Sequence, residues 1–158
     1  MFKMIRIALL SLSVAVLGSG VAHAQGGLSA EDHAEIVQLY ATYNLALDGG
    51  DAQGWADTFV EDGVFANNTG RAALIAFAEG FTEQQAGHAR HWNTNIHLTK
   101  TTDGAAGTCY LMLMNAGARP HSVIVTGTYH DTLVKTTDGW RFTSRQVEPD
   151  PAADTDQN

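Results

Sequence analysis

The chain has 158 residues, of which nine are basic and seventeen acidic, for a formal net charge of −8 with histidine neutral. An acidic protein repels nucleic acid and anionic lipid, so both are disfavoured as partners. The single cysteine, Cys109, excludes an internal disulfide, and its apolar neighbours predict a buried thiol rather than a nucleophile.

Residues 1–24 have the features of a secretory signal peptide. Lys3 and Arg6 precede an apolar stretch at residues 7–16, and Ala22-His23-Ala24 fits a small-x-small cleavage site. The stretch is too short for a permanent membrane span, although an uncleaved anchor is the alternative. We expect cleavage after Ala24, leaving a periplasmic or secreted protein of 134 residues that no longer contacts the membrane. Seven basic and seventeen acidic side chains then remain, for a net charge of −10.

The next segment is predicted to form one long helix. Ser29 fits an N-cap, an apolar stripe follows at helical spacing, and Gly49-Gly50 ends the helix after Asp48. The stripe consists of Ile36, Leu39, Tyr40, Tyr43, Ala46 and Leu47. A second column beside it contains Val37, Ala41, Asn44 and Asp48. Because Asp48 ends a column that begins with apolar residues, we expect its carboxylate to be partly buried.

Two further helices are predicted before the chain becomes strand-like. Asp51 can cap a short helix that carries Trp55 and Phe59, and residues 71–81 have a helical apolar stripe. Between them we expect a turn at residues 61–63 and a brief strand at residues 64–65.

The second half of the chain is rich in Thr, Val, Ile and aromatic residues, which is typical of strands. The expected strands are residues 90–100, 108–115, 121–135 and 140–147. Asp103-Gly104 and Asp138-Gly139 are hairpin signals. We therefore predict one α+β domain over residues 25–148, a cone-shaped curved antiparallel sheet with three N-terminal helices enclosing a pocket. Residues 149–158 are predicted to be a disordered acidic tail.

Several short motifs together indicate a family. They are Leu47-Asp48-Gly49-Gly50-Asp51, Phe59-Val60-Glu61-Asp62-Gly63, Arg90-His91 with Asn95, Tyr129-His130-Asp131, and Asp138-Gly139-Trp140-Arg141-Phe142. With these motifs the chain, over residues 29–148, resembles the nuclear-transport-factor-2-like superfamily in its SnoaL-like branch. That superfamily includes dehydratases, isomerases, polyketide cyclases, epoxide hydrolases and members without known activity, so the fold alone does not establish catalysis.

The closest functional pattern is similar to that of scytalone dehydratase and bile-acid dehydratases. The resemblance implies a catalytic pair of Asp48 and His91, with Tyr43 as a further catalytic residue and Arg145 near the substrate. The match is incomplete, because the second pocket histidine of scytalone dehydratase falls where this chain has Tyr110, Leu111 or Met112.

Strand alternation raises a difficulty for His91. A regular strand puts His91, Asn93, Asn95 and His97 on one face, and Trp92, Thr94, Ile96 and Leu98 on the other. Since the apolar face should meet the core, His91 is expected to point away from it, unless the concave side of the cone is a polar pocket.

Other residues are candidates for substrate binding. They are Asn95, Tyr110, Met112, Tyr129, Asp131 and Arg145. Asp131 could instead pair with Arg141, and Tyr43 could be a core residue with its hydroxyl satisfied. Without a bulge, Phe142 and Arg145 lie on opposite faces of the last strand, so only one of them would face the pocket.

No metal and no cofactor are expected, because His88, His91 and His97 lack a third ligand at a recognisable zinc spacing. The sequence thus predicts a cofactor-independent dehydratase or isomerase that acts on a small apolar hydroxy or carbonyl compound through Asp–His acid–base catalysis. The alternatives are a non-catalytic small-molecule-binding domain and a dimerisation domain of the same fold. A homodimer is expected in each case, because a curved sheet leaves one face uncovered.

Overall fold

The computed structural model describes residues 27–151. The predicted signal peptide and residues 152–158 of the predicted tail lie outside the described part of the chain. Within residues 27–151, no helix combines the length and the apolar character that a membrane span requires.

The first helix, α1 (Ala30–Gly49), has the predicted ends. The side chain of Ser29 accepts a hydrogen bond from the backbone of Asp32, which satisfies one free N–H of the first turn. At the other end Gly50 has φ 77°, a left-handed conformation that glycine adopts without strain. The buried residues of α1 belong to the predicted apolar stripe.

Two shorter helices complete the helical layer. In α2 (Ala52–Ala56) the predicted cap is present, because Asp51 Oδ1 accepts a hydrogen bond from the backbone N–H of Gly54 at 2.9 Å. The third helix, α3 (Arg71–Gln85), continues one turn beyond the predicted residue 81.

Six strands form one sheet in the order β2-β1-β6-β5-β4-β3. The strands are β1 (Phe59–Phe65), β2 (Asn68–Thr69), β3 (Ala89–Lys100), β4 (Ala105–Asn115), β5 (Ser122–Thr136) and β6 (Gly139–Pro149). β3 to β6 form the predicted antiparallel meander, whereas β1 pairs with β6 in parallel. The turn expected at residues 61–63 is instead part of β1, with an irregular register between Phe59 and Val64.

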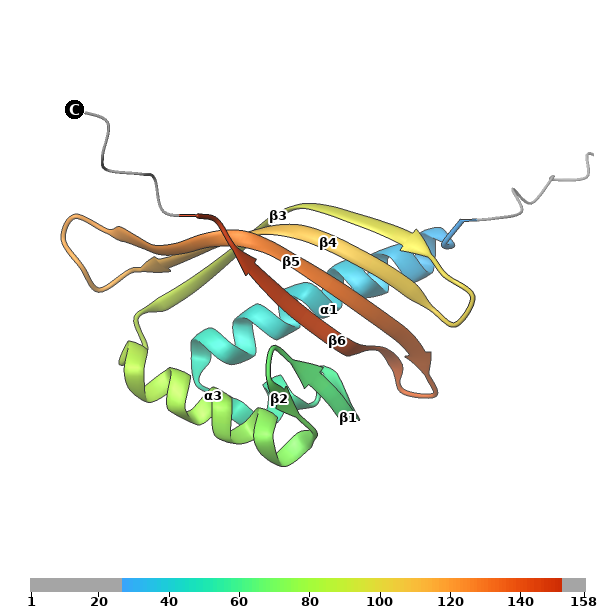
Figure 1. Ribbon diagram of the computed structural model, residues 1–158, viewed down its shortest axis with the longest axis horizontal. Coiled ribbons are helices and arrows are strands. Elements are labelled where there is room, and N and C mark those ends of the chain that lie inside the picture. The colour runs from blue at the N-terminus through green and yellow to red at the C-terminus, as the bar shows by residue number, and fades with distance from the viewer. Residues whose placement is uncertain (1–26, 152–158) are drawn as a thin grey trace, which may run out of the picture.

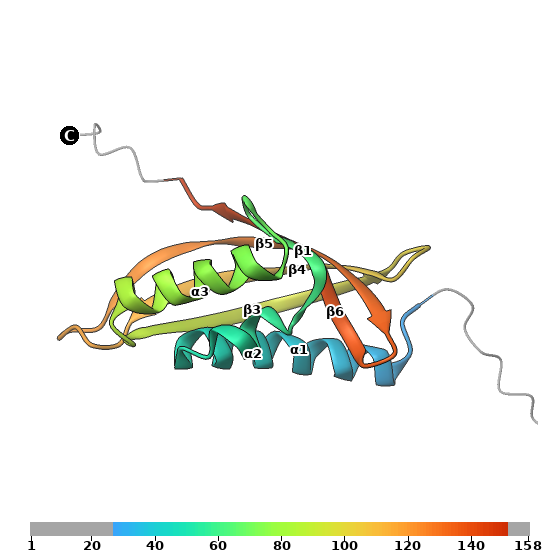
Figure 2. The same cartoon turned by 90° about the horizontal axis from the view of Figure 1, so that it is seen from below.

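The long strands bend over the helices, which all lie on one side of the sheet (Figure 1). Seen from below, α1 and α3 cover this concave side next to each other (Figure 2). The core lies between the two layers and consists largely of aromatic and aliphatic side chains from α1, β1 and β4 to β6. This confirms the predicted α+β cone.

Two of the β-bulges in the sheet determine which side chains of β3 and β6 face the helices. In β3 the pairing with β4 shifts between Thr94 and His97, and Asn95 has φ 56°. In β6 the pairing with β5 shifts so that Thr143 has no partner between Phe142 and Ser144. One extra residue reverses the alternation of side chains beyond it. Residues before and after a bulge that strict alternation would put on opposite faces therefore lie on the same face of the sheet.

The end of the sheet extends slightly past the predicted domain boundary. Pro149 pairs with Gly127, and the backbone N–H of Asp150 donates to the carbonyl of Thr126. The first residues assigned to the tail are thus held at the edge of β5.

Candidate functional site

Asp48 and His91 contact each other through two hydrogen bonds. The Nδ1 atom of His91 lies 2.6 Å from Oδ1 of Asp48, and the backbone N–H of His91 donates to Oδ2 at 2.8 Å. Both side chains are largely buried, with exposed fractions of 4% for His91 and 11% for Asp48. The carboxylate of Asp48 therefore binds both the ring and the backbone N–H of His91, which fixes the direction of the ring.

The two residues come from elements that are distant in sequence. Asp48 is in the last turn of α1, and His91 is the third residue of β3, on which α1 packs. The ring of Phe81 from α3 lies 5.6 Å from the imidazole ring, centroid to centroid. The hydrogen bonds that His91 makes to described residues use Nδ1 and the backbone N–H, and none of them uses Nε2.

The bulge in β3 removes the difficulty with the direction of His91. His91 pairs with Leu113 and Asn93 with Leu111, and both leucines are buried. Beyond the bulge, Ile96 and Leu98 pack against the same core. The strand therefore presents His91, Ile96 and Leu98 to the same concave side, whereas Trp92 points outward.

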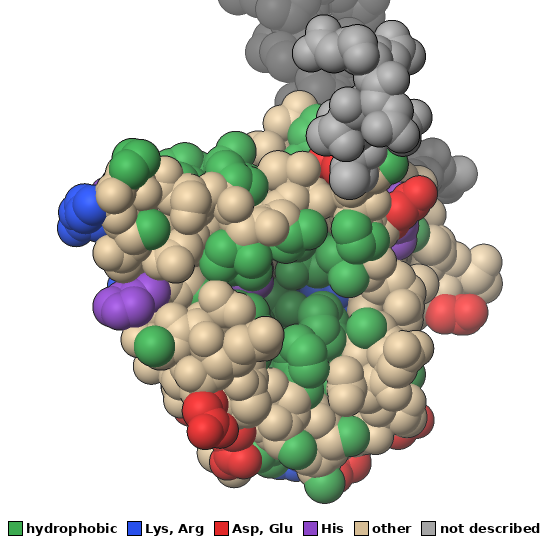
Figure 3. All heavy atoms as spheres, turned by 60° about the vertical axis from the view of Figure 1, so that its left-hand side comes forward, with side chains coloured by type: hydrophobic (Ala, Val, Ile, Leu, Met, Phe, Trp, Pro, Cys, Tyr) green, Lys and Arg blue, Asp and Glu red, His purple; other side chains and the backbone are tan. Residues whose placement is uncertain are grey.

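A hollow opens on the side of the molecule turned forward in Figure 3. Its walls are mainly hydrophobic, and a histidine and a basic side chain are visible inside it (Figure 3). The cone thus has an apolar entrance with polar groups in its interior.

A second polar cluster is completely enclosed in the core. Arg145 from β6 donates from Nε to Oδ1 and from Nη2 to Oδ2 of Asp131 on β5, each at 2.8 Å, and the hydroxyl of Tyr40 donates to the same carboxylate. The guanidinium carbon lies 4.2–4.5 Å from the ring centroids of Tyr40, Tyr43, Tyr129 and Phe142. Asp131 therefore pairs with Arg145 and not with Arg141.

The charges of this cluster are mutually stabilised. Burial lowers the pKa of Arg145, but the hydrogen bonds and the negative charge of Asp131 outweigh it and hold that pKa above its ordinary value. Burial, followed by the charge of Asp131, raises the pKa of Tyr40. Burial likewise raises the pKa of Tyr129 and of Cys109 to about 12 each. The phenols and the thiol are therefore neutral at physiological pH, as expected for a buried Cys109.

Tyr43 is part of the aromatic core. Its ring is fully buried and contacts the rings of Trp55, Phe59 and Phe142 among others. Its hydroxyl, beside that of Tyr129, has no well-formed hydrogen bond to a described residue, and burial raises its pKa well above the usual range. A ligand would reach this hydroxyl only after displacement of the surrounding rings.

Three of the predicted substrate-binding residues are not in the cone. Asn95 is exposed at the bulge, Tyr110 is 58% exposed, and Met112 pairs with Trp92 on the outer face of the sheet. In β4 the residues at 109, 111 and 113 are the buried ones, so Tyr110 and Met112 point the other way by simple alternation. Tyr129, Asp131 and Arg145 do lie in the interior.

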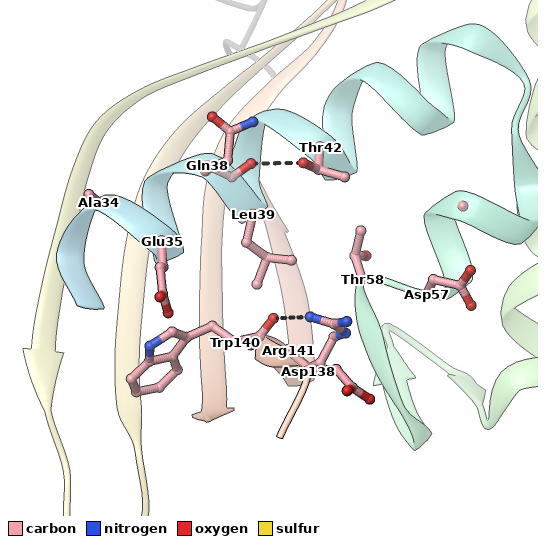
Figure 4. A pocket seen from close by; sticks show the side chains of 12 residues that line it. Ala34, Glu35, Gln38, Leu39, Thr42, Asp57, Thr58, Asp138, Trp140 and Arg141 are labelled. Carbon is pink, nitrogen blue, oxygen red and sulfur yellow. Dashed lines mark hydrogen bonds between the residues drawn. The ribbon is translucent and has the colours of Figure 1, made fainter. Parts of the chain in front are cut away.

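A large cleft lies elsewhere on the described part of the chain. It has a volume of about 660 Å³ and separates α1 from the β5–β6 hairpin (Figure 4). Leu39 and Thr58 form part of its lining, and Arg141 donates to the carbonyl of Trp140 at its edge (Figure 4). Asp48 and His91 do not line this cleft. Among residues 27–151, no group of three or more His, Cys, Asp or Glu side chains could hold a metal ion.

Sequence reasoning assigned no site role to Asn44 or Asn93, and it counted Tyr40 only in the apolar stripe. Asn44 and Asn93 have buried amide oxygens without a hydrogen-bond partner among the described residues. The spacing of four residues between Tyr40, Asn44 and Asp48 was the signal that could have revealed a shared helix face.

A curved open sheet covered by N-terminal helices is the architecture of nuclear-transport-factor-2-like proteins, and a solved protein of Novosphingobium aromaticivorans with this fold is 27% identical to the chain. The match covers 74% of this chain and 80% of that protein's chain, with a TM-score of 0.69. Residues 28–146 match the SnoaL-like domain family, and the chain belongs to that family. The resemblance inferred from the motifs is therefore confirmed.

Other solved structures are similar over most of their length. Aln2 from a Streptomyces species is 30% identical, with 77% of this chain and 93% of that chain covered and a TM-score of 0.71. A second protein of Novosphingobium aromaticivorans, provisionally named scytalone dehydratase, is 25% identical, with coverage of 81% and 90% and a TM-score of 0.64. No curated protein matches the chain.

The enclosed ion pair of Arg145 and Asp131 leads to a prediction about the free energy of unfolding. Arg145→Met leaves the charge of Asp131 buried without a partner, so we expect the free energy of unfolding to fall by about 3–5 kcal/mol. In the double variant Arg145→Met with Asp131→Leu no charge is stranded, and most of the loss should be recovered. Chemical denaturation measures both.

The exposed pair of Arg71 and Asp57 provides the control, because Arg71→Met should change stability by less than about 1 kcal/mol. A double variant as unstable as Arg145→Met would contradict the proposed cost of the stranded charge.

Proposed function

We propose that this protein is a cofactor-independent dehydratase or isomerase of a small apolar hydroxy or carbonyl compound. The observation that carries the proposal is the two-point contact of Asp48 with His91, at 2.6 and 2.8 Å, in a largely buried position. A histidine oriented by a carboxylate is a general acid–base group that works at neutral pH. The provisional name of the 25% identical Novosphingobium protein supports the same class of reaction.

In the proposed mechanism His91 takes a proton from the carbon next to a substrate carbonyl through Nε2. Asp48 keeps Nδ1 protonated and stabilises the imidazolium that results. In a dehydratase the imidazolium then returns the proton to the leaving hydroxyl, which departs as water. In an isomerase it returns the proton to another carbon of the same molecule.

The apolar surroundings favour an apolar substrate. Phe81 lies against the imidazole, and Phe77 stacks on Phe81 with ring centroids 6.3 Å apart. A hydrocarbon skeleton loses no hydrogen bonds when it enters such an environment, whereas a highly charged compound would lose its hydration. The substrate should therefore be largely apolar apart from its reacting groups.

The first test is the activity of His91→Ala and Asp48→Asn. A panel of enolisable ketones and β-hydroxy ketones is supplied in deuterated water, and NMR follows exchange of the proton next to the carbonyl while absorbance follows enone formation. We expect His91→Ala to lower either rate by about 10²–10⁴-fold, because general acid–base catalysis contributes that much. Asp48→Asn should lower it in the same direction, since the amide cannot stabilise the imidazolium.

His97→Ala is the matched control, because His97 is exposed on the same strand and should leave the rates unchanged. Turnover that survives His91→Ala would disprove the mechanism. Tight ketone binding without any exchange by the unaltered protein would instead support the non-catalytic binding domain.

We further propose that the protein works in the periplasm or outside the cell. The positive and apolar segments before Ala24 support this proposal. Expression of the full chain in a bacterial host, followed by mass spectrometry of the exported fraction, should find an N-terminus at Gln25. Recovery of the intact N-terminus from the cytoplasm alone would contradict it.

We also propose that a second copy of the chain covers the outer face of the sheet. Trp92 and Tyr110 are 55% and 58% exposed on this face, beside a cleft of about 440 Å³. Apart from Asp150 the residues that line the cleft are uncharged. An identical copy offers an equally uncharged cleft lining, so two copies can pack symmetrically there with few opposing like charges.

Trp92→Arg should therefore convert a dimer into a monomer, because it introduces a charge at the centre of this face. Analytical ultracentrifugation measures the mass, and circular dichroism checks that the fold is retained. The control is Leu45→Arg, at a 73% exposed residue of α1, which should remain dimeric. An unaltered protein that is monomeric at high micromolar concentration would refute the proposal.

A further inference from the structure

Asn44 lies on the face of α1 that is turned toward the sheet. Tyr40, Asn44 and Asp48 are spaced by four residues, so their side chains lie above one another on the helix. Tyr40 contacts Asp131 and Asp48 contacts His91, both on the inner face of the sheet. Asn44, midway between them, therefore faces the same inner surface.

Asn93 approaches the same place from the strand. It is two residues after His91 and shares its face of β3, since the bulge comes only later. The helix runs antiparallel to β3, because residues near the start of α1 line a cleft with Lys100 while its end contacts His91. Asn44 lies one helical turn before Asp48, and Asn93 lies two residues after His91. Because the two elements are antiparallel, both residues are displaced from the Asp48–His91 pair in the same direction. From this geometry Asn44 and Asn93 should lie close to each other, next to the Asp48–His91 pair.

Both asparagines have an unused hydrogen-bonding atom. The Oδ1 atoms of Asn44 and Asn93 are buried, and no described residue donates to either of them. By contrast, Oδ1 of Asn115 accepts hydrogen bonds from the backbone of Gly117 and Ala118 at 2.9 and 3.1 Å. A buried polar atom without a partner costs stability, so two such atoms beside a candidate catalytic pair need a reason.

We propose that Asn44 and Asn93 bind a hydroxyl group of the substrate, separate from the atoms that His91 protonates and deprotonates. The inference rests on the proposed function, because it makes these residues determinants of specificity for the same site. The substrate class becomes a hydroxylated carbonyl compound that carries a second oxygen away from the reacting carbon.

A hydroxyl group fits this site better than a charged group. A carboxylate would approach the carboxylate of Asp48 and would bring no donor for the amide oxygens. An ammonium group would have to lose its hydration next to Phe81 and the apolar wall. A hydroxyl can donate to an amide oxygen, which is the atom without a partner in both asparagines, while Nδ2 of Asn93 donates to the carbonyl of Tyr110.

The experiment compares a ketone with its hydroxylated forms. Calorimetry measures binding of 2-tetralone and of its 5-, 6-, 7- and 8-hydroxy derivatives to the full exported protein. We expect at least one hydroxy isomer to bind about tenfold more tightly than the parent ketone, the usual effect of one satisfied buried hydrogen bond. Asn44→Leu and Asn93→Leu should each remove most of this preference while still binding the parent ketone.

Thermal unfolding separates this role from a structural one. Leucine has a similar volume and no polar atom, so Asn44→Leu and Asn93→Leu should raise the unfolding midpoint by about 2 °C or more. Asn115→Leu, at the satisfied asparagine, should lower the midpoint and keep the preference for the hydroxy isomer. Leucine variants that lose stability, or that keep the preference, would overturn the inference, as would equal binding of all five ketones by the unaltered protein.

His91→Ala distinguishes the inference from the proposed function. It should abolish proton exchange and retain the hydroxyl preference. A preference that depends on both asparagines in a protein without any exchange supports the binding site and refutes the enzyme. Exchange that depends on His91 without a hydroxyl preference refutes the binding site and supports the enzyme.

Discussion

The position of α1 on the sheet depends on the buried pair of Arg145 and Asp131. The guanidinium group lies among four aromatic rings, and the carboxylate also takes the hydroxyl of Tyr40 from the helix. A buried charge is tolerated only where its partner and its hydrogen bonds are fixed, so these elements cannot slide past one another. With α1 held at Tyr40, the end of the helix two turns later comes within hydrogen-bonding distance of β3, where Asp48 meets His91.

The two polar groups of the cone have different characters. Arg145 and Asp131 neutralise each other in a closed core, whereas the hydrogen bonds of His91 to described residues use only Nδ1 and the backbone N–H. Between them on α1 lies Asn44, whose amide oxygen has no described partner. Atoms without a described partner occur in both regions, since Nη1 of Arg145 and the hydroxyl of Tyr43 lack one as well as the amide oxygens of Asn44 and Asn93. The closed cluster around Arg145 fixes α1 through Tyr40, and the Asp48–His91 pair lies at the end of the same helix.

Much of the fold could be predicted from local sequence. Ser29, Asp51 and Gly50 set the helix ends, and the two Asp-Gly turns set the hairpins, because caps and turns depend on a few neighbouring residues. The parallel pairing of β1 with β6 was not predicted, since it joins segments about 80 residues apart. The pairing of Asp48 with His91 came from family resemblance, and no spacing rule would have provided it.

The sequence by itself determined the α+β order of elements, the family and the partly buried end of the first helix, because these depend on local pattern and motif. Only the tertiary structure decided which side chains face the cone. The bulge at Asn95 brings Ile96 and Leu98 to the face of His91, the bulge at Thr143 brings Arg145 to the face of Phe142, and plain alternation turns Tyr110 and Met112 outward. A bulge is a mismatch in length between two paired strands, so it exists only once both strands are in register and cannot be read from either one alone.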